Sequence, residues 1–166
     1  MVLANSRGPE TLSGLVRELG TRAHAATAGE AARDADFAVL AFPYAPGHLL
    51  PAKELAGKVV LDINNYMPWR DGRFPEVDSG RVTVHELRQA QLPGATVAKA
   101  FTHIQFHERF EIRVPSDALP ALVRLARPAG APDRKALVVS SDHPEAVERV
   151  TEFYDDLGFD AADNSR

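Results

Sequence analysis

The sequence contains no cysteine and no long uninterrupted apolar run, and each absence excludes a class of protein. Without cysteine there are no disulfides, no thiolate metal ligands and no cysteine nucleophile, which fits a cytoplasmic protein. A membrane span needs about 18 or more consecutive apolar residues, and none are present. The N-terminus also lacks the basic and apolar stretches of a signal peptide. Because the net charge is −4 and no basic block occurs, nucleic-acid binding is not expected as the main activity.

Short apolar runs alternate with helical patterns along the 166 residues. The clearest strand covers residues 37–42, which is apolar on both faces and is stopped by Pro43. Strands that alternate with helices of this length are typical of βαβ units. We therefore expect an α/β fold of the Rossmann-like, doubly wound kind, with a mostly parallel sheet.

The individual elements follow from apolar periodicity and from proline and glycine positions. Strands are predicted over residues 2–4, 23–26, 37–42, 58–62, 96–101, 136–139 and 159–162. Helices are predicted over residues 12–19, 29–35, 47–56, 84–91, 116–127 and 144–157, and a long loop over residues 63–79.

The first strand is followed by Asn5, Ser6, Arg7, Gly8 and Pro9. In a dinucleotide-binding fold the end of the second strand meets the adenosine ribose, where NAD enzymes place an acid and NADP enzymes an arginine. Here no acid follows the strand directly, and a guanidinium that can bind a phosphate through two hydrogen bonds is present. Taken alone, the same residues also fit a turn and a helix cap, with Ser6 as the cap.

Four segments together carry a wider resemblance: residues 4–12, 60–66, 99–101 and 157–160. In this order they resemble the NADPH-dependent deazaflavin (coenzyme F420) reductases and their relatives, over nearly the whole chain. The resemblance implies an NADP(H)-dependent oxidoreductase that transfers hydride between NADPH and a small deazaflavin or flavin-type acceptor. A metal reductase with the same domain, and a non-catalytic NADP-binding or dimerisation module, are the alternatives. A homodimer is left open.

The resemblance also implies roles for the residues at matching positions. Those that would bind the 2′-phosphate of NADP are Ser6 and Arg7. Those that would lie along the ribose and nicotinamide are Ala41, Phe42, Pro43 and Tyr44, and those that would edge the cleft are Asp62, Asn64 and Asn65. Phe101 and Thr102 would border the substrate pocket, although the family commonly has Asn where this chain has Thr102. Because hydride transfer needs two stacked rings held in place, no catalytic side chain is assigned.

Two polar clusters offer other chemistry. His103 and His107 lie four residues apart with Glu108 beside them, as in many zinc sites. No third ligand stands at a diagnostic spacing, so pocket-lining or surface histidines are preferred and no metal is expected. Residues 140–143, Ser-Ser-Asp-His, suggest a hydrolase, but triads are built from separate segments. A cap for the helix that starts at Pro144 is the preferred interpretation.

The sequence has no Gly-x-Gly-x-x-Gly loop, which normally follows the first strand of this fold and holds the pyrophosphate. The chain begins at what matches the second strand. We therefore expect residues 1–166 to form a single, partial NADP-binding Rossmann-like domain, N-terminally incomplete, with weak cofactor binding and little turnover. Since the first strand lies mid-sheet, the sheet must close up, borrow a strand from a second copy, or keep a gap.

Overall fold

The computed structural model describes residues 1–44, 50–102 and 121–165. The chain divides into two compact units, Met1–Val97 and Ala98–Arg166, called here the first and the second unit. Among the described helices, none combines the length and apolarity that crossing a bilayer requires.

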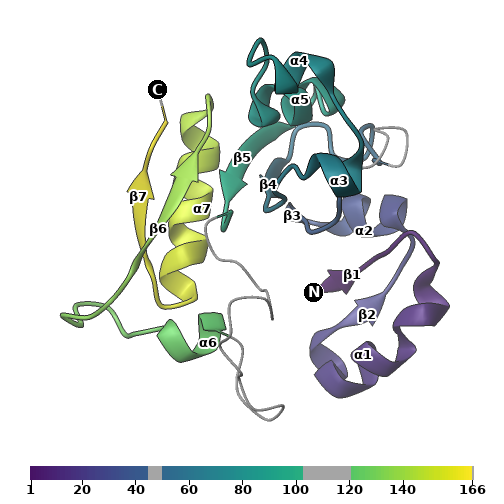
Figure 1. Cartoon of the computed structure of the whole chain (residues 1–166). Coiled ribbons are helices and arrows are strands. Elements are labelled where there is room, and N and C mark those ends of the chain that lie inside the picture. The colour runs from purple at the N-terminus through teal and green to yellow at the C-terminus, as the bar shows by residue number, and fades with distance from the viewer. Residues whose placement is uncertain (45–49, 103–120, 166) are drawn as a thin grey trace. The chain divides into compact units, whose positions relative to one another are not determined.

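Strands and helices alternate along the chain, as the sequence pattern predicts (Figure 1). The elements up to the second helix are β1 (Val2–Leu3), the 3-10 turn η1 (Pro9–Leu12), α1 (Ser13–Leu19), the 3-10 turn η2 (Gly20–Arg22), β2 (His24–Ala25) and α2 (Ala28–Asp34). The elements that follow are β3 (Phe37–Leu40), β4 (Val59–Asp62), α3 (Pro68–Asp71), α4 (Pro75–Asp78) and α5 (Val84–Gln91). The last are β5 (Thr96–Ala100), α6 (Ala121–Leu125), β6 (Ala136–Ser140), α7 (Pro144–Asp156) and β7 (Asp160–Asp163).

Five strands form a mostly parallel sheet in the order β3-β4-β5-β6-β7. In the first unit β3 and β4 run parallel, with Leu40 opposite Asp62 at their carboxyl ends. In the second unit β6 and β7 are also parallel, whereas β5 and β6 are antiparallel, with Lys99 opposite Ser140. The α/β class with a mostly parallel sheet, expected from the sequence, is confirmed.

The first two strands form a separate sheet. β1 and β2 pair in parallel, and among the described residues neither joins β3, which ends the five-stranded sheet. Val39 on β3 is 44% exposed, while the neighbouring Leu40 is only 6% exposed. Among the described residues β1 and β3 do not pair, so the sheet has not closed up between them, whereas a strand borrowed from a second copy and a lasting gap both stay predictions.

Two helices of the first unit begin with a capping box. Thr27 before α2 and Thr83 before α5 each accept a hydrogen bond from the backbone N–H three residues later. Glu30 and Glu86 at those positions accept the N–H of the threonine in return. These capping boxes satisfy orphan donors at both helix starts.

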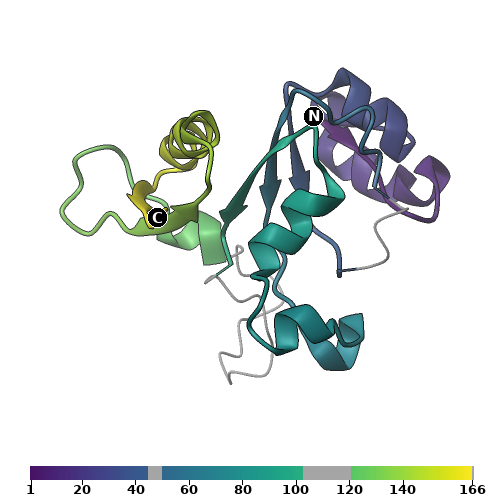
Figure 2. The same cartoon turned by 90° about the horizontal axis from the view of Figure 1, so that it is seen from above.

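The core of the first unit lies between its helices and β3 and β4. Its members are buried aliphatic residues from several elements: Ala32, Leu40, Leu50, Leu55, Val60, Leu92, Ala95 and Val97. α5 lies beside these strands (Figure 2), and Gln89 accepts a hydrogen bond from the N–H of Val97 on β5. This contact joins α5 to the amino end of β5, and the approach of Arg88 on α5 to Asp62 brings the helix to the carboxyl end of β4.

Some predicted elements differ from the structure. The described part of the helix predicted over residues 47–56 forms consecutive turns over residues 52–57, in which the N–H of Leu55 donates to the carbonyl of Pro51, and Gly57 has a φ of 75°. The loop predicted over residues 63–79 contains α3 and α4, each of which starts at a proline. Of the helix predicted over residues 116–127, the described part forms α6 over residues 121–125, and residues 126–127 lie beyond its end.

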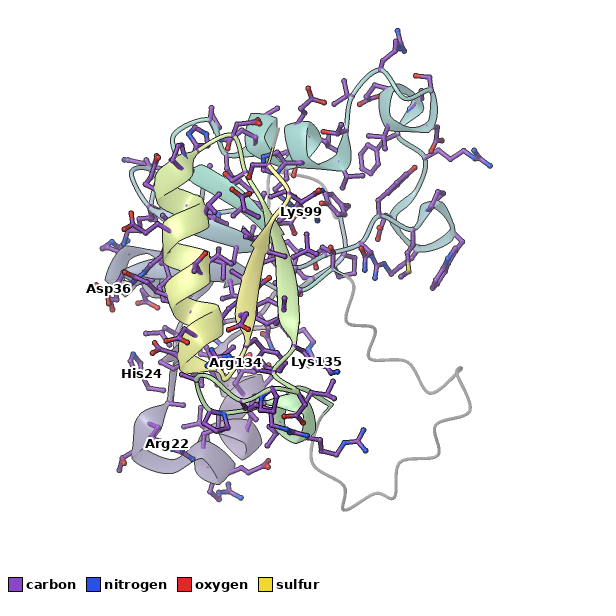
Figure 3. The ribbon with its side chains drawn as sticks, turned by 90° about the vertical axis from the view of Figure 1, so that its left-hand side faces the viewer. Arg22, His24, Asp36, Lys99, Arg134 and Lys135 are labelled. Atoms are coloured by element: carbon purple, nitrogen blue, oxygen red, sulfur yellow. The ribbon has the colours of Figure 1, made fainter. Side chains whose placement is uncertain are left out.

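In the second unit, α7 packs against β6 and β7, and its buried residues are Ala146, Val150 and Tyr154. Arg134 lies where α7 ends and β7 begins (Figure 3). Its guanidinium donates to the carbonyl of Phe159 at 2.7 Å, and its Nε lies 2.9 Å from the carboxylate of Asp160. Arg134 therefore joins β6, α7 and β7, and its contacts are those of a structural residue.

Candidate cofactor site

The turn after β1 is held by its own side chains. Asn5 Oδ1 accepts the N–H of Arg7 at 3.0 Å, and Asn5 Nδ2 donates to Thr11 Oγ1 at 2.9 Å. Ser6 and Arg7 are exposed at the tip of this turn. The N-cap of η1 is Gly8, without a side-chain cap, so Ser6 does not serve as the helix cap that the alternative interpretation required. Both the hydroxyl and the guanidinium thus face solvent at the carboxyl end of β1.

Gly8 is favoured in this turn by its backbone conformation. Its φ of 104° lies in a region that other residues rarely adopt. The carboxylate of Glu10, at the end of an exposed side chain, lies directly against Gly8. Glu10 therefore places a negative charge beside the turn that carries Arg7.

The residues after β3 differ in exposure. Ala41 and Pro43 are exposed, Phe42 is half-buried, and Tyr44 is 1% exposed. The phenol of Tyr44 donates to Asp62 Oδ2 at 2.6 Å. Burial of the ring, together with the Asp62 carboxylate, raises the pKa of Tyr44 far above its usual value. The phenol therefore remains a hydrogen-bond donor to Asp62.

The residues after β4 tie this strand to β3. Asp62 is fully buried, and its Oδ1 accepts hydrogen bonds from the side chain of Asn64 at 2.6 Å and from the N–H of Asn64 at 3.1 Å. Asn64 Nδ2 and the N–H of Ile63 both donate to the carbonyl of Leu40 at the end of β3. Asp62 thus acts behind the surface, where it holds the two strand ends together.

An arginine on α5 completes this cluster. Arg88 is fully buried, and its Nε lies 3.5 Å from Asp62 Oδ2. The centre of its guanidinium is 4.3 Å from the ring centroid of Tyr44 and 5.6 Å from that of Phe42, which are cation–π distances. Its Nη1 donates to Gln91 Oε1 at 2.9 Å. Phe42, Tyr44, Asp62, Asn64 and Arg88 are called the wall cluster from here on.

A second carboxylate, that of Asp71 on α3, accepts a hydrogen bond from the backbone N–H of Tyr44. Asp71 has a fully buried side chain and accepts hydrogen bonds from Arg70 at 2.6 Å and from the N–H of Met67 at 2.9 Å. Burial alone would raise the pKa of Asp71, but these donors and the N–H of Tyr44 lower it. Arg70 also donates to the carbonyl of Asn65 at 2.7 Å. The loop after β4 is therefore anchored to the residues after β3.

Phe101 and Thr102 follow β5 in the second unit, and both are half-buried. Phe101 has a φ of 56°, which is rare for a bulky residue and indicates local strain. Its N–H donates to the phenol of Tyr154 at 3.0 Å, and that phenol donates to the carbonyl of Val138 at 2.9 Å. The two rings also meet edge to face at 4.7 Å. Tyr154 therefore holds the turn that ends β5.

The exposed Arg7 after β1 and the buried wall cluster at the ends of β3 and β4 both belong to the first unit. Residues 1–66 match the family of coenzyme F420-dependent NADP oxidoreductases. The resemblance expected from the sequence is confirmed over this part of the chain. No curated protein matches the chain significantly.

Two solved structures share the fold. One is a hypothetical protein from Sinorhizobium meliloti, with a TM-score of 0.68 and 28% identity, covering 99% of this chain and 72% of that one. The other is a candidate F420-dependent NADP-reductase from Arthrobacter sp. FB24, with a TM-score of 0.70 and 22% identity, covering 99% of this chain and 73% of that one. Both likenesses support the Rossmann-like fold class.

The structure brings together some of the residues predicted as a site. Phe42, Tyr44, Asp62 and Asn64 form one cluster, and Asn65 borders it through Arg70. Ser6 and Arg7 form a separate, exposed turn, while Ala41 and Pro43 contribute exposed backbone after β3. The histidines considered as metal ligands, His103 and His107, lie outside the described residues, as does Glu108.

The second polar cluster, before α7, differs from its prediction. The N-cap residue of α7 is His143, whose side chain makes no capping hydrogen bond. Ser141 Oγ instead accepts the N–H of His143 at 3.2 Å, which stabilises the turn into the helix. Among the described residues no three His, Asp or Glu side chains gather as a metal site would require.

Sequence reasoning missed Arg88. A signal was present, because Arg88 stands four residues after Val84 and four before Leu92, on the apolar stripe of α5. An arginine at such a position is either exposed by a break in the stripe or buried with a partner. The buried carboxylate of Asp62, at the end of an apolar strand, was the partner to look for.

Proposed function

We propose that the chain is the NADP(H)-binding part of an oxidoreductase, and that Ser6 and Arg7 hold the 2′-phosphate of the cofactor. The observation that carries this proposal is the turn after β1, which exposes a hydroxyl and a guanidinium on a backbone fixed by Asn5. This donor set fits a phosphate dianion, because a guanidinium binds phosphate oxygens through paired, charge-assisted hydrogen bonds. A ribose 2′-hydroxyl would call for a carboxylate acceptor there instead.

The wall cluster supports a position for the rest of the cofactor. Ligands of open α/β sheets bind beyond the carboxyl ends of the strands, and the exposed residues Ala41 and Pro43 stand there after β3. The ribose and nicotinamide would lie along residues 41–44, with Asn64 and Asn65 at the edge. When bound, the nicotinamide supplies or accepts the hydride, and the chain's own residues position it.

The acceptor is proposed to be a deazaflavin or a flavin. The match of residues 1–66 to the F420-dependent family supports this choice. A planar acceptor ring needs a stacking surface more than an acid or a base. We assign Phe101 and Thr102 to the acceptor pocket, with the strained backbone of Phe101 as the supporting observation.

The gap in the sheet supports a further proposal about the domain. β1 and β3 belong to separate sheets within the first unit, and Val39 on β3 is exposed. We propose that this NADP-binding Rossmann-like domain accepts one more parallel strand between them. Unpaired strand edges bind other backbone readily, so without that strand the chain should self-associate.

The exposed turn after β1 also fits a second candidate function. A non-catalytic NADP-binding or dimerisation module would keep the turn after β1 and would show no turnover.

The test is to measure binding and turnover on one sample. We expect weak NADPH binding and a slow loss of absorbance at the nicotinamide band when coenzyme F420 or a flavin is added. Binding without turnover would favour the non-catalytic module. Reduction of ferric complexes alone, with flavin and deazaflavin untouched, would favour a metal reductase. Absence of NADPH binding would refute the proposal.

A further inference from the structure

The burial of Arg88 is unfavourable for the free energy of folding. It is fully buried, and its Nη2 has no hydrogen-bond partner among the residues that the structure describes. Taking a guanidinium out of water costs free energy, and an unpaired buried donor adds to that cost. An apolar side chain of similar volume, together with a neutral partner in place of Asp62, is often at least as stable. Stability alone therefore does not account for an arginine here.

The contacts of Arg88 point instead to the residues around the proposed cofactor position. Its guanidinium stacks on the rings of Phe42 and Tyr44, which follow β3. Its Nε approaches the carboxylate of Asp62, and that carboxylate binds Tyr44 from one side and Asn64 from the other. One side chain from α5 thus reaches the residues that follow both strands.

The planar guanidinium suits this task better than a lysine would. It can stack on two rings with its face while its edge donates to Asp62 and to Gln91. A lysine ammonium is a point charge and cannot hold a ring plane and a carboxylate in one fixed geometry. The orientation of Phe42 and Tyr44 therefore depends on the arginine fork.

We propose that Arg88 is a positioning residue for the nicotinamide end of the bound cofactor. It sets the orientation of Phe42 and Tyr44 from behind, and it fixes the separation of the carboxyl ends of β3 and β4 through Asp62. This inference rests on the proposed NADP(H) function of the same site. Arg88 itself does not touch the cofactor, since it is fully buried.

The experiment compares variants of two buried arginines in the full chain. Arg88→Met removes the charge from the wall cluster, and Arg88→Lys keeps it. The double variant Arg88→Met with Asp62→Asn removes the charge pair and leaves no buried carboxylate alone, with Asp62→Asn as its reference. Arg134→Met is the matched control, because Arg134 is also buried and ion-paired but belongs to the second unit. Each variant is assayed for unfolding by urea and for NADPH affinity by fluorescence titration.

We expect Arg88→Met to weaken NADPH binding about tenfold at a temperature where the protein is folded, with partial rescue by Arg88→Lys. Arg134→Met should lower stability and leave the affinity unchanged. The double variant decides between roles: it should recover stability relative to Arg88→Met and remain weak in NADPH binding compared with Asp62→Asn. Recovery of affinity together with stability would overturn the proposal, because Arg88 would then be merely structural.

Hydrogen exchange separates this inference from the proposed function. The N–H groups of Ile63 and Asn64 bond to Leu40 and Asp62, so their exchange reports the joined strand ends directly. If the wild type binds no NADPH, the proposed function fails. The positioning role of Arg88 is then tested by hydrogen exchange alone. Faster exchange of these two amides in the double variant than in Asp62→Asn would support Arg88 as the residue that sets the wall. Equal exchange in both variants would overturn it.

Discussion

The turn after β1 and the wall cluster both belong to the first unit, and they are built in opposite ways. The turn is local: Asn5, Arg7, Gly8 and Thr11 lie within seven consecutive positions, and the charged group faces solvent. The wall cluster gathers residues that follow β3 and β4 with one from α5, and its charges are buried. The comparison teaches that the part that would recognise the phosphate is short and exposed, whereas the part that would orient the ring depends on tertiary packing.

This difference predicts that the two regions respond to mutation through different quantities. Changes in the wall cluster should appear first as lost stability. Changes in the turn should appear as lost affinity for a phosphorylated ligand, with stability unaffected.

The largest effect on stability is expected for Arg88→Met. It leaves the carboxylate of Asp62 buried without its cation, and breaking a buried pair in this way costs about 3–5 kcal/mol. The double variant with Asp62→Asn should lose clearly less, because no buried charge then remains. Urea denaturation of both variants measures the effect. Equal losses in the single and double variants would show that the ion pair does not govern the stability of the cluster.

The next effect is on affinity. Arg7→Ala should weaken NADP binding about tenfold to a hundredfold, because a charge-assisted contact to the 2′-phosphate is lost. NAD binding and the unfolding midpoint should not change, since Arg7 is exposed. Glu10→Gln is the matched control on the same turn: it removes the negative charge beside Gly8 and should strengthen NADP binding. Calorimetric titration of both variants with both nucleotides checks the pair, and a fall in NADP affinity for Glu10→Gln would refute the charge argument.

Tyr44→Phe should have a smaller effect, which depends on pH. Near neutral pH the loss of the hydrogen bond to Asp62 should cost about 1.5–3 kcal/mol. Because the pKa of Tyr44 is raised in the folded protein, the unfolded chain loses its phenolic proton first, above about pH 10. Wild-type stability should therefore fall as the pH rises beyond that point, and the advantage over the variant should shrink. Denaturation between neutral and alkaline pH tests this, and a constant difference would contradict the burial of the phenol.

The smallest effect is expected at the edge of the sheet. Val39→Ala should cost less than about 1 kcal/mol because the side chain is largely exposed, whereas Leu40→Ala should cost about 2–5 kcal/mol. The comparison is sharp because the two residues are neighbours on β3. If Val39→Ala proved as costly as Leu40→Ala, β3 would be covered in solution, and light scattering would show whether a second copy covers it.

The sequence predicted the α/β class, the strand positions and the turn after β1, because each depends on short-range patterns. Apolar runs specify β3 and β4, and the turn that presents Ser6 and Arg7 is held by the nearby side chain of Asn5. Helix 47–56 was predicted wrongly over its described part, because apolar periodicity over so short a stretch does not by itself stabilise a helix. The wall cluster was predicted only in part. Tyr44 and Asp62 were named, but the residue that joins them comes from α5, and single-sequence periodicity does not show which strand end a helix will approach.

The most direct measurement of the central claim uses a ligand that carries only the part recognised by the turn. Adenosine 2′,5′-bisphosphate and adenosine 5′-monophosphate differ by the 2′-phosphate, and neither needs a pyrophosphate loop. Titrated against residues 1–166, the bisphosphate should bind about tenfold or more tightly than the monophosphate, and Arg7→Ala should remove the difference. Equal binding of the two nucleotides by the wild type would contradict the assignment of the turn after β1 to NADP.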